Sequence, residues 1–166
     1  MSLADSAIAF YDAKYTFQRW RPVTAIRMAD IDGNPATVAD PNWLPLAGIT
    51  PADPSYPGAH STISAAGAEV LGSFFGDHQR FSVMSPALPG VTRPFTSYTA
   101  AEQEAGLSRI YAGVHTRIDH EAGLRLGHDV AAFVLGSALL PERDDWAVDG
   151  VRPATESTRG VLRRAW

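Results

Sequence analysis

Cysteine is absent from this 166-residue chain, so neither disulfides nor thiolate metal sites can form. Lysine is nearly absent as well, because Lys14 stands among 14 basic residues that are otherwise all arginine. The formal net charge of −4 and a pI near 5.7 argue against a nucleic-acid partner, since such proteins usually display a basic face. A single lysine in such a chain is a candidate for a specific role.

Long apolar runs are also lacking. The longest uncharged apolar run, from Val130 to Leu140, is about half of the roughly 20 residues that span a bilayer. We therefore expect a soluble chain without a membrane span, and the N-terminus lacks the regions of a signal peptide, which leaves localisation open. With 45% hydrophobic residues, the chain is expected to form one domain over 1–166, in which residues 141–166 are an extended tail.

Apolar periodicity predicts four helices and no strand, and therefore an all-α helical bundle. The first helix carries Ile8, Tyr11 and Tyr15 at helical spacing. A capping box of Thr99 and Glu102 is expected to open the third helix. The predicted helices cover residues 5–20, 60–75, 99–111 and 119–140, and a Pro-rich loop covers 28–57.

Basic residues and a histidine near helix ends suggest a site for an anion. Lys14 and Arg21 share one face if the first helix persists, and two cations on one face suit an anion; the alternative is a pair of solvated surface charges. His60 follows the small-residue turn Pro57-Gly58-Ala59 and begins a helix, where free N–H groups and the helix dipole attract an oxyanion. There His60 would act as an acid or base, unless it is only a helix-start or core residue.

A second group of polar residues lies between the last two predicted helices. His115 precedes Asp119 by four residues, so the carboxylate could orient one ring nitrogen and make the other a better nucleophile. Arg109 adds a planar guanidinium suited to the oxygens of an oxyanion. The alternative is an intrahelical ion-pair network that has no chemical role.

These residues form three motifs in a fixed order. The motifs are Lys14-x6-Arg21-Pro22, Pro57-Gly58-Ala59-His60 and Ser108-Arg109-x5-His115-x3-Asp119. Together they resemble the motifs of the superfamily of vanadium-dependent haloperoxidases and type 2 phosphatidic acid phosphatases, and the flanking residues are closest to its soluble bacterial haloperoxidase-like branch. Full members of that branch are longer, so the chain is expected to be their C-terminal half, completed by a missing N-terminal half or paired in a homodimer.

The resemblance implies a vanadate or phosphate oxyanion as cofactor or substrate, with no divalent metal. The implied binding residues are Lys14, Arg21, Gly58, Ala59, Arg109 and His115. In this comparison His115 ligates the vanadate, Asp119 holds His115 in position, and His60 manages the proton. Lys14 would in addition polarise peroxide during halide oxidation.

Three functions are compatible with these residues. The leading one is a vanadium-dependent haloperoxidase, whose small-molecule substrates would be a halide and hydrogen peroxide. The alternatives are a soluble acid phosphatase, which hydrolyses a phosphate ester through a phosphohistidine at His115, and a catalytically impaired oxyanion-binding or oligomerisation module. The motif residues do not separate the two enzymes, because phosphate and vanadate resemble each other.

One departure from the family pattern bears on activity. The middle motif of the family usually reads Pro-Ser-Gly-His, so Gly58 removes a hydroxyl, and loss of an oxyanion donor can cost about 10²- to 10³-fold in rate. Ser55 or Ser61 could supply a substitute hydroxyl, and Ala59 would be strained if its φ had to be positive. The remaining histidines are interpreted as surface residues; they are His78, His120 and His128.

Overall fold

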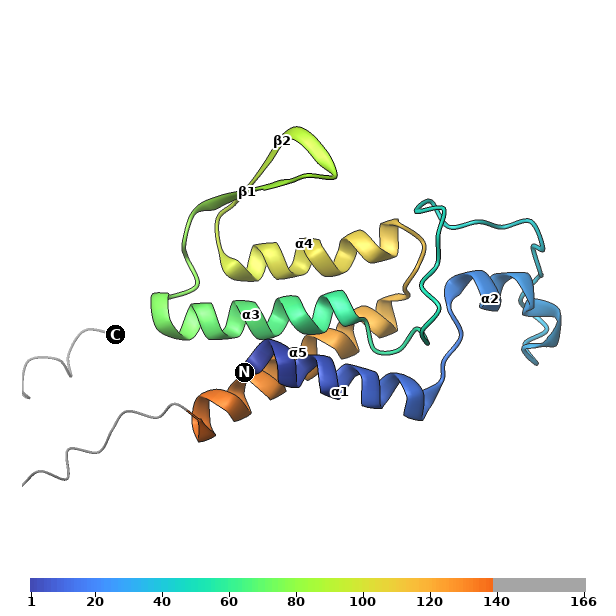
Figure 1. Cartoon of the computed structure of the whole chain (residues 1–166). Helices are drawn as coiled ribbons and strands as arrows, with labels where there is room; N and C mark the ends of the chain where they lie inside the picture. Colours follow the sequence, from blue (N-terminus) through green and yellow to red (C-terminus); the bar gives the residue numbers. More distant parts are fainter. Residues whose placement is uncertain (139–166) are drawn as a thin grey trace, which may run out of the picture.

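The computed structural model describes residues 1–138, so the predicted tail over 141–166 lies outside the described residues. Four long helices pack side by side, with α3 in contact with each of the other three (Figure 1). They are α1 (Ser2–Phe17), α3 (Ala59–Phe75), α4 (Tyr98–Tyr111) and α5 (Arg117–Ser137). The predicted helical bundle is confirmed, and within 1–138 no helix is both long and apolar enough to cross a bilayer.

Small residues bring α3 and α5 close together. A Cβ added at Gly123 would meet the carbonyl oxygen of Gly58, and one added at Gly127 would meet the carbonyl oxygen of Thr62. Ala65 on α3 is fully buried nearby. The two helices therefore approach at backbone distance, and the start of α3 is fixed against the first turns of α5.

Helix α1 turns an unexpected face to the bundle. Its buried residues are Ser2, Ser6, Phe10 and Lys14, spaced four apart. The stripe predicted from apolar periodicity is instead exposed: Ile8 by 70%, Tyr11 by 48% and Tyr15 by 58%. The inner face combines two serines, which permit close helix packing, with Phe10 and the polar Lys14, so apolar periodicity does not mark it.

The first helix is also shorter than predicted. It ends at Phe17 because Gln18 adopts a left-handed conformation, with φ 46° and ψ 41°. The chain then begins a short helix, α2 (Pro22–Arg27), with Arg21 as its N-cap residue and Pro22 in its first turn. Lys14 and Arg21 consequently do not share a helix face, because the first helix does not persist to Arg21, which was the condition for it.

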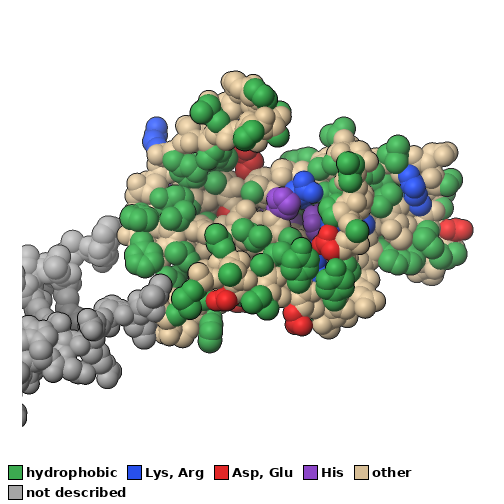
Figure 2. Space-filling model, in the orientation of Figure 1, with side chains coloured by type: hydrophobic (Ala, Val, Ile, Leu, Met, Phe, Trp, Pro, Cys, Tyr) green, Lys and Arg blue, Asp and Glu red, His purple; other side chains and the backbone are tan. Residues whose placement is uncertain are grey.

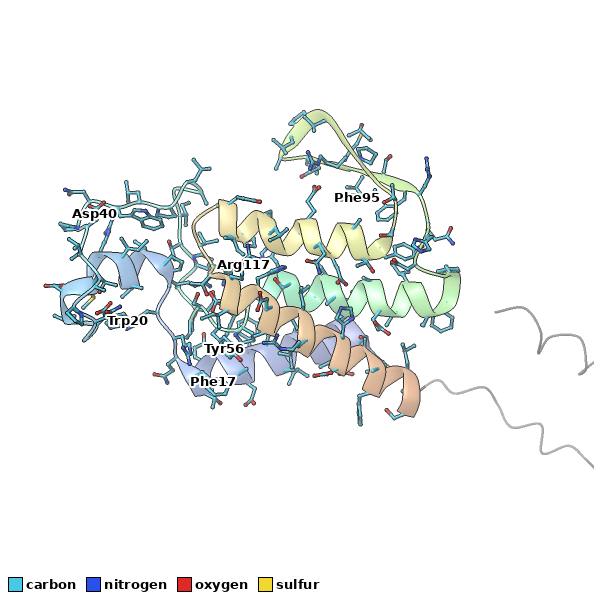
Figure 3. The ribbon with its side chains drawn as sticks, turned by 180° about the vertical axis from the view of Figure 1, so that it is seen from behind. Phe17, Trp20, Asp40, Tyr56, Phe95 and Arg117 are labelled. Atoms are coloured by element: carbon cyan, nitrogen blue, oxygen red, sulfur yellow. The ribbon has the colours of Figure 1, made fainter. Side chains whose placement is uncertain are left out.

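The segment after α2 leaves the bundle and returns to it. It contains a 3₁₀ turn, η1 (Ala29–Ile31), and then loop residues up to the start of α3, as the arm in Figure 1 shows. On its return, Tyr56 packs edge-on against Phe17 with ring centroids 5.4 Å apart, and both are labelled in Figure 3. This contact holds the loop before α3 against the end of α1.

A two-stranded hairpin corrects the prediction that the chain has no strand. Strands β1 (Phe81–Ser85) and β2 (Leu88–Phe95) pair antiparallel, with Phe81 opposite Phe95. Phe95, labelled in Figure 3, lies where β2 returns towards α4. Pro89 and Pro94 obscured the strand in the sequence, but a two-stranded hairpin has two free edges, where proline is tolerated.

Helix ends and buried histidines bring further corrections. The N-cap of α4 is Ser97, whose Oγ accepts a hydrogen bond from the Ala100 N–H at 2.9 Å, in place of the predicted capping box at Thr99 and Glu102. Helix α5 ends at Ser137, a few residues before the predicted end. His120 is only 3% exposed and pairs with Ser61 Oγ at 2.9 Å, so its assignment to the surface is wrong.

Candidate functional site

The predicted site residues converge from five separate segments of the chain. Lys14 lies in the last turn of α1 and Arg21 caps α2, while His60 is in the first turn of α3. Arg109 lies in the last turn of α4, and His115 and Asp119 flank the start of α5. We call these six residues the oxyanion cluster, after the ligand that their sequence motifs predict. Histidine and basic side chains lie together on the face shown in Figure 2, with an acidic side chain beside them.

His115 lies between a carboxylate and a guanidinium group. Its Nδ1 is 3.3 Å from Asp119 Oδ2, and its Nε2 is 2.9 Å from Arg21 Nη1. An ionised carboxylate can only accept a hydrogen bond and a guanidinium can only donate one. Nδ1 therefore carries the proton, and the lone pair of Nε2 accepts a hydrogen bond from Arg21. Burial, with a contribution from the charge of Arg21, lowers the pKa of His115 despite the opposing effect of Asp119, which favours this neutral form.

Asp119 is fixed as an anion by its neighbours. Besides His115, its Oδ2 accepts hydrogen bonds from Ser55 Oγ at 2.7 Å and from the Thr116 N–H at 2.8 Å. Burial alone would raise the pKa of Asp119, but these hydrogen bonds outweigh burial and lower it to about 2. Asp119 also completes a capping box with Thr116 at the start of α5, so one residue both begins the helix and orients His115.

Lys14 is fully buried, and its ammonium group is surrounded by oxygen atoms of the loop before α3. Nζ donates to the carbonyl oxygens of Pro54 and, at 3.2 Å, of Ser55, and lies 2.9 Å from Asp53 Oδ2. Burial lowers the pKa of Lys14 and the charge of Arg21 acts in the same direction, while Asp53 opposes both. The lysine therefore ties the end of α1 to this loop.

Arg21 connects the loop to His115. Its Nε donates to the carbonyl oxygen of Asp53 and its Nη1 to that of Val114, each at 2.9 Å. Its Nη2 forms an ion pair with Asp53 Oδ2 at 3.1 Å. The guanidinium is thereby held rigidly beside Nε2 of His115.

Arg109 and His60 complete the cluster from α4 and α3. Nε of Arg109 is buried and has no hydrogen-bond partner among residues 1–138, which is costly unless a ligand accepts from it. His60 is exposed overall, yet partial loss of water and the charges of Arg109, His115 and Arg21 lower its pKa. The unpaired guanidinium N–H, the neighbouring cations and the lone pair of His115 fit an oxyanion such as vanadate.

The turn before α3 contributes less than expected. The Gly58 N–H already donates to the carbonyl oxygen of Asp119 at 2.8 Å, so it is not free to bind an oxyanion unless that bond is exchanged. Ala59 occupies the first position of α3 and is not among the residues with positive φ, so the strain considered for it does not arise. Neither substitute hydroxyl is free, because Ser55 Oγ binds Asp119 and Ser61 Oγ pairs with His120.

Asp53 is the residue of this region that the sequence did not indicate. One oxygen of its carboxylate, Oδ2, contacts both Lys14 and Arg21. It lies in a loop without periodicity, and only its position four residues before Pro57, at the start of the middle motif, could have drawn attention to it. Within 1–138, no group of histidine and acidic residues is arranged to hold a metal ion.

The family model described as "VCPO second helical-bundle domain" matches residues 1–140. The chain belongs to the vanadium haloperoxidase family. Among solved structures, a bacterial vanadium-dependent iodoperoxidase is 34% identical, with a TM-score of 0.70 over 81% of this chain and 31% of its own. No curated protein matches the chain.

More distant members of the vanadium haloperoxidase family share the fold. Holo-type and apo-type structures of bacterial vanadium-dependent chloroperoxidase are 20% and 21% identical, with TM-scores of 0.62 and 0.60. They match 79% and 78% of this chain, and 32% and 34% of their own chains. This member of the family therefore spans about a third of the length of the solved structures that it resembles.

Proposed function

We propose that the oxyanion cluster binds vanadate and that the chain carries the cofactor-binding part of a haloperoxidase that oxidises halide with hydrogen peroxide. The observation that carries this proposal is the position of His115 between Asp119 and Arg21. Nε2 accepts an N–H of Arg21, and if that N–H turned from Nε2 to an oxygen of the anion, the same guanidinium would hold the oxyanion and the Nε2 lone pair would be free to ligate it.

Different residues of the oxyanion cluster would contact different parts of the anion. Arg109 and Arg21 would donate to its oxygens and Lys14 would add positive charge, while Nε2 of His115 would bind the central atom. When bound, vanadate would supply Lewis-acid activation of hydrogen peroxide. Asp119 would keep the proton of His115 on Nδ1 throughout.

His60 is suited to proton transfer. Its lowered pKa leaves the imidazole largely neutral near pH 7, so it can accept a proton from hydrogen peroxide and later return it to product. Its exposed position gives substrates access to it. Iodide is the halide to test first, because the solved structure at 34% identity is that of an iodoperoxidase.

Acid phosphatase activity is the second candidate, and the same Nε2 lone pair favours it, since that atom could attack phosphorus. The test is calorimetric titration of the full 166-residue chain with orthovanadate and with phosphate, followed by assays of iodide oxidation and of phosphate ester hydrolysis. His115→Ala and Arg109→Ala should abolish anion binding, whereas the exposed His78→Ala should leave it unchanged.

The outcomes separate the three functions. Vanadate binding that depends on His115, with iodide oxidation, supports the haloperoxidase. Ester hydrolysis without iodide oxidation would replace it with the phosphatase, and anion binding without either activity would make the chain a non-catalytic oxyanion-binding module. Failure to bind either anion would contradict the proposal.

A further inference from the structure

Asp53 places a negative charge directly beside the cations of the oxyanion cluster. Its Oδ2 lies 2.9 Å from Lys14 Nζ and 3.1 Å from Arg21 Nη2, and its side chain is 24% exposed. Burial opposes ionisation of this carboxyl, but the hydrogen bond and charge of Lys14 outweigh burial and lower the pKa of Asp53. The carboxylate is therefore ionised at neutral pH.

The three donors of Lys14 are all engaged. Two contacts are to backbone carbonyl oxygens of Pro54 and Ser55, which are fixed by the loop, and the third is to the Asp53 side chain. A side-chain rotation can release only the Asp53 contact. An oxyanion that approaches Lys14 must therefore share the ammonium with Asp53 or displace it.

Asp53 also changes the charge that an incoming anion meets. Lys14, Arg21 and Arg109 bring three formal positive charges to the cluster, and Asp119 is engaged with His115 on the other side of the ring. Asp53 cancels one of these charges at contact distance. A fixed negative charge repels a dianion about twice as strongly as a monoanion at the same distance.

We propose that Asp53 tunes specificity at this site: its carboxylate partly neutralises Lys14 and Arg21, and so weakens the binding of a dianionic phosphate ester more than that of a monoanionic oxyanion. This inference rests on the proposed function, because it assumes that the oxyanion cluster binds an anion. Orthovanadate is mainly a monoanion at neutral pH, whereas phosphate monoesters are mainly dianions, since their second pKa is about 6. Asp53 thereby favours the vanadate cofactor over phosphate ester substrates.

The test is calorimetric titration of the full chain, near neutral pH, with dilute orthovanadate and with methyl phosphate. Asp53→Asn removes the charge and keeps the shape, and Asp53→Ser serves as a second neutral variant if the first folds poorly. The control is Asp12→Asn, which makes the same change of charge at an exposed position of α1. Thermal unfolding of each variant, with and without anion, provides a readout that is independent of catalysis.

We expect the neutral variants to bind methyl phosphate roughly tenfold or more tightly than the natural chain, and to gain less for vanadate. Methyl phosphate should also raise the unfolding temperature of Asp53→Asn more than that of Asp12→Asn. Equal gains for both anions, or no gain, would overturn the role of Asp53 while leaving the proposed function intact. If neither the natural chain nor the Asp53 variants bind either anion, the proposed function itself fails, and this inference fails with it.

Discussion

His115 and His128 both contact carboxylates, but their second ring nitrogens face opposite kinds of group. His115 has Asp119 on one side and Arg21 on the other. His128 has Glu69 at 2.9 Å from Nδ1 and Glu102 at 3.3 Å from Nε2. Because a carboxylate only accepts, both contacts of His128 are hydrogen bonds only when the ring carries two protons. A neighbouring carboxylate is therefore not enough to mark a histidine as part of a binding site. The partner of its second ring nitrogen distinguishes the two cases.

The two histidines also differ in how deeply their side chains are buried. The side chain of His115 is 4% exposed, and its neighbours Arg21 and Asp119 are buried with it. The side chain of His128 is 39% exposed, and it links α5 to α3 through the half-exposed Glu69 and to α4 through the buried Glu102. We conclude that His115 is arranged to present a lone pair, whereas His128 is arranged to cross-link helices.

The largest effect is expected from Asp119→Asn, which removes the carboxylate that holds the proton on Nδ1 of His115. Three donors that now point at Asp119 Oδ2 would lose a charged acceptor, so the free energy of unfolding should fall by about 2–3 kcal/mol. Vanadate binding should weaken strongly, because a neutral amide holds the proton on Nδ1 of His115 less firmly than a carboxylate does. Urea unfolding and calorimetry measure both effects.

The matched control for that change is Asp129→Asn, at an exposed position of the same helix. It alters the charge equally without touching His115. If both variants bind vanadate as the natural chain does, Asp119 does not control the tautomer of His115.

Low pH should lower the free energy of unfolding through protonation of Asp119, the partner of His115. The pKa of Asp119 is about 2 in the folded chain against an ordinary value of 3.8, so its contribution is present above about pH 4 and is lost as the pH falls towards 2. The loss attributable to this residue is about 2 kcal/mol. Urea unfolding as a function of pH should show a steeper decline for the natural chain than for Asp119→Asn; equal slopes would contradict this assignment.

His128→Gln tests whether His128 stabilises the fold without contributing to anion binding. We expect a loss of about 1–2 kcal/mol in the free energy of unfolding, because the contact with Glu69 is partly exposed to solvent but Glu102, whose side chain is 2% exposed, would lose a donor. Vanadate affinity should not change. A large loss of affinity would mean that the two histidines are coupled through α5.

The smallest effect is expected from Gly58→Ser, which restores the residue usual in the family. An added Cβ would lie 3.1 Å from the carbonyl oxygen of Asp119 and 3.3 Å from Ser61 Oγ, so a small shift of the neighbours is needed. We expect a loss of up to about 1 kcal/mol in stability, in the range of mild overpacking. Vanadate affinity should change by less than about threefold, because the new hydroxyl would contact these atoms first. A gain above tenfold would show that the missing hydroxyl limits the site.

The sequence predicted which polar residues come together better than it predicted which faces of the helices are buried. The spacing of Arg109, His115 and Asp119 and the position of His60 at a helix start indicated residues that the structure brings together. Short-range spacing carries this information because each motif lies at a helix end, where geometry depends on few residues.

What the sequence could not show depends on contacts between distant segments. Lys14 and Arg21 meet through the loop around Asp53, which has no periodic pattern, and not through a shared helix face. The apolar stripe of α1 is exposed, and the face that packs against α3 and α5 is instead the mixed one of Ser2, Ser6, Phe10 and Lys14. His120 is buried because Ser61 approaches it from α3, a contact that no local pattern encodes.

The tautomer of His115 is the most direct test of this account, and nitrogen-15 NMR of the histidine rings measures it. The His115 signals can be assigned by their absence in His115→Gln. At neutral pH we predict that Nδ1 carries the proton and Nε2 does not, and that addition of vanadate shifts the Nε2 signal selectively. A proton on Nε2, or a doubly protonated ring, would contradict the account, because His115 would then have no lone pair to offer an oxyanion.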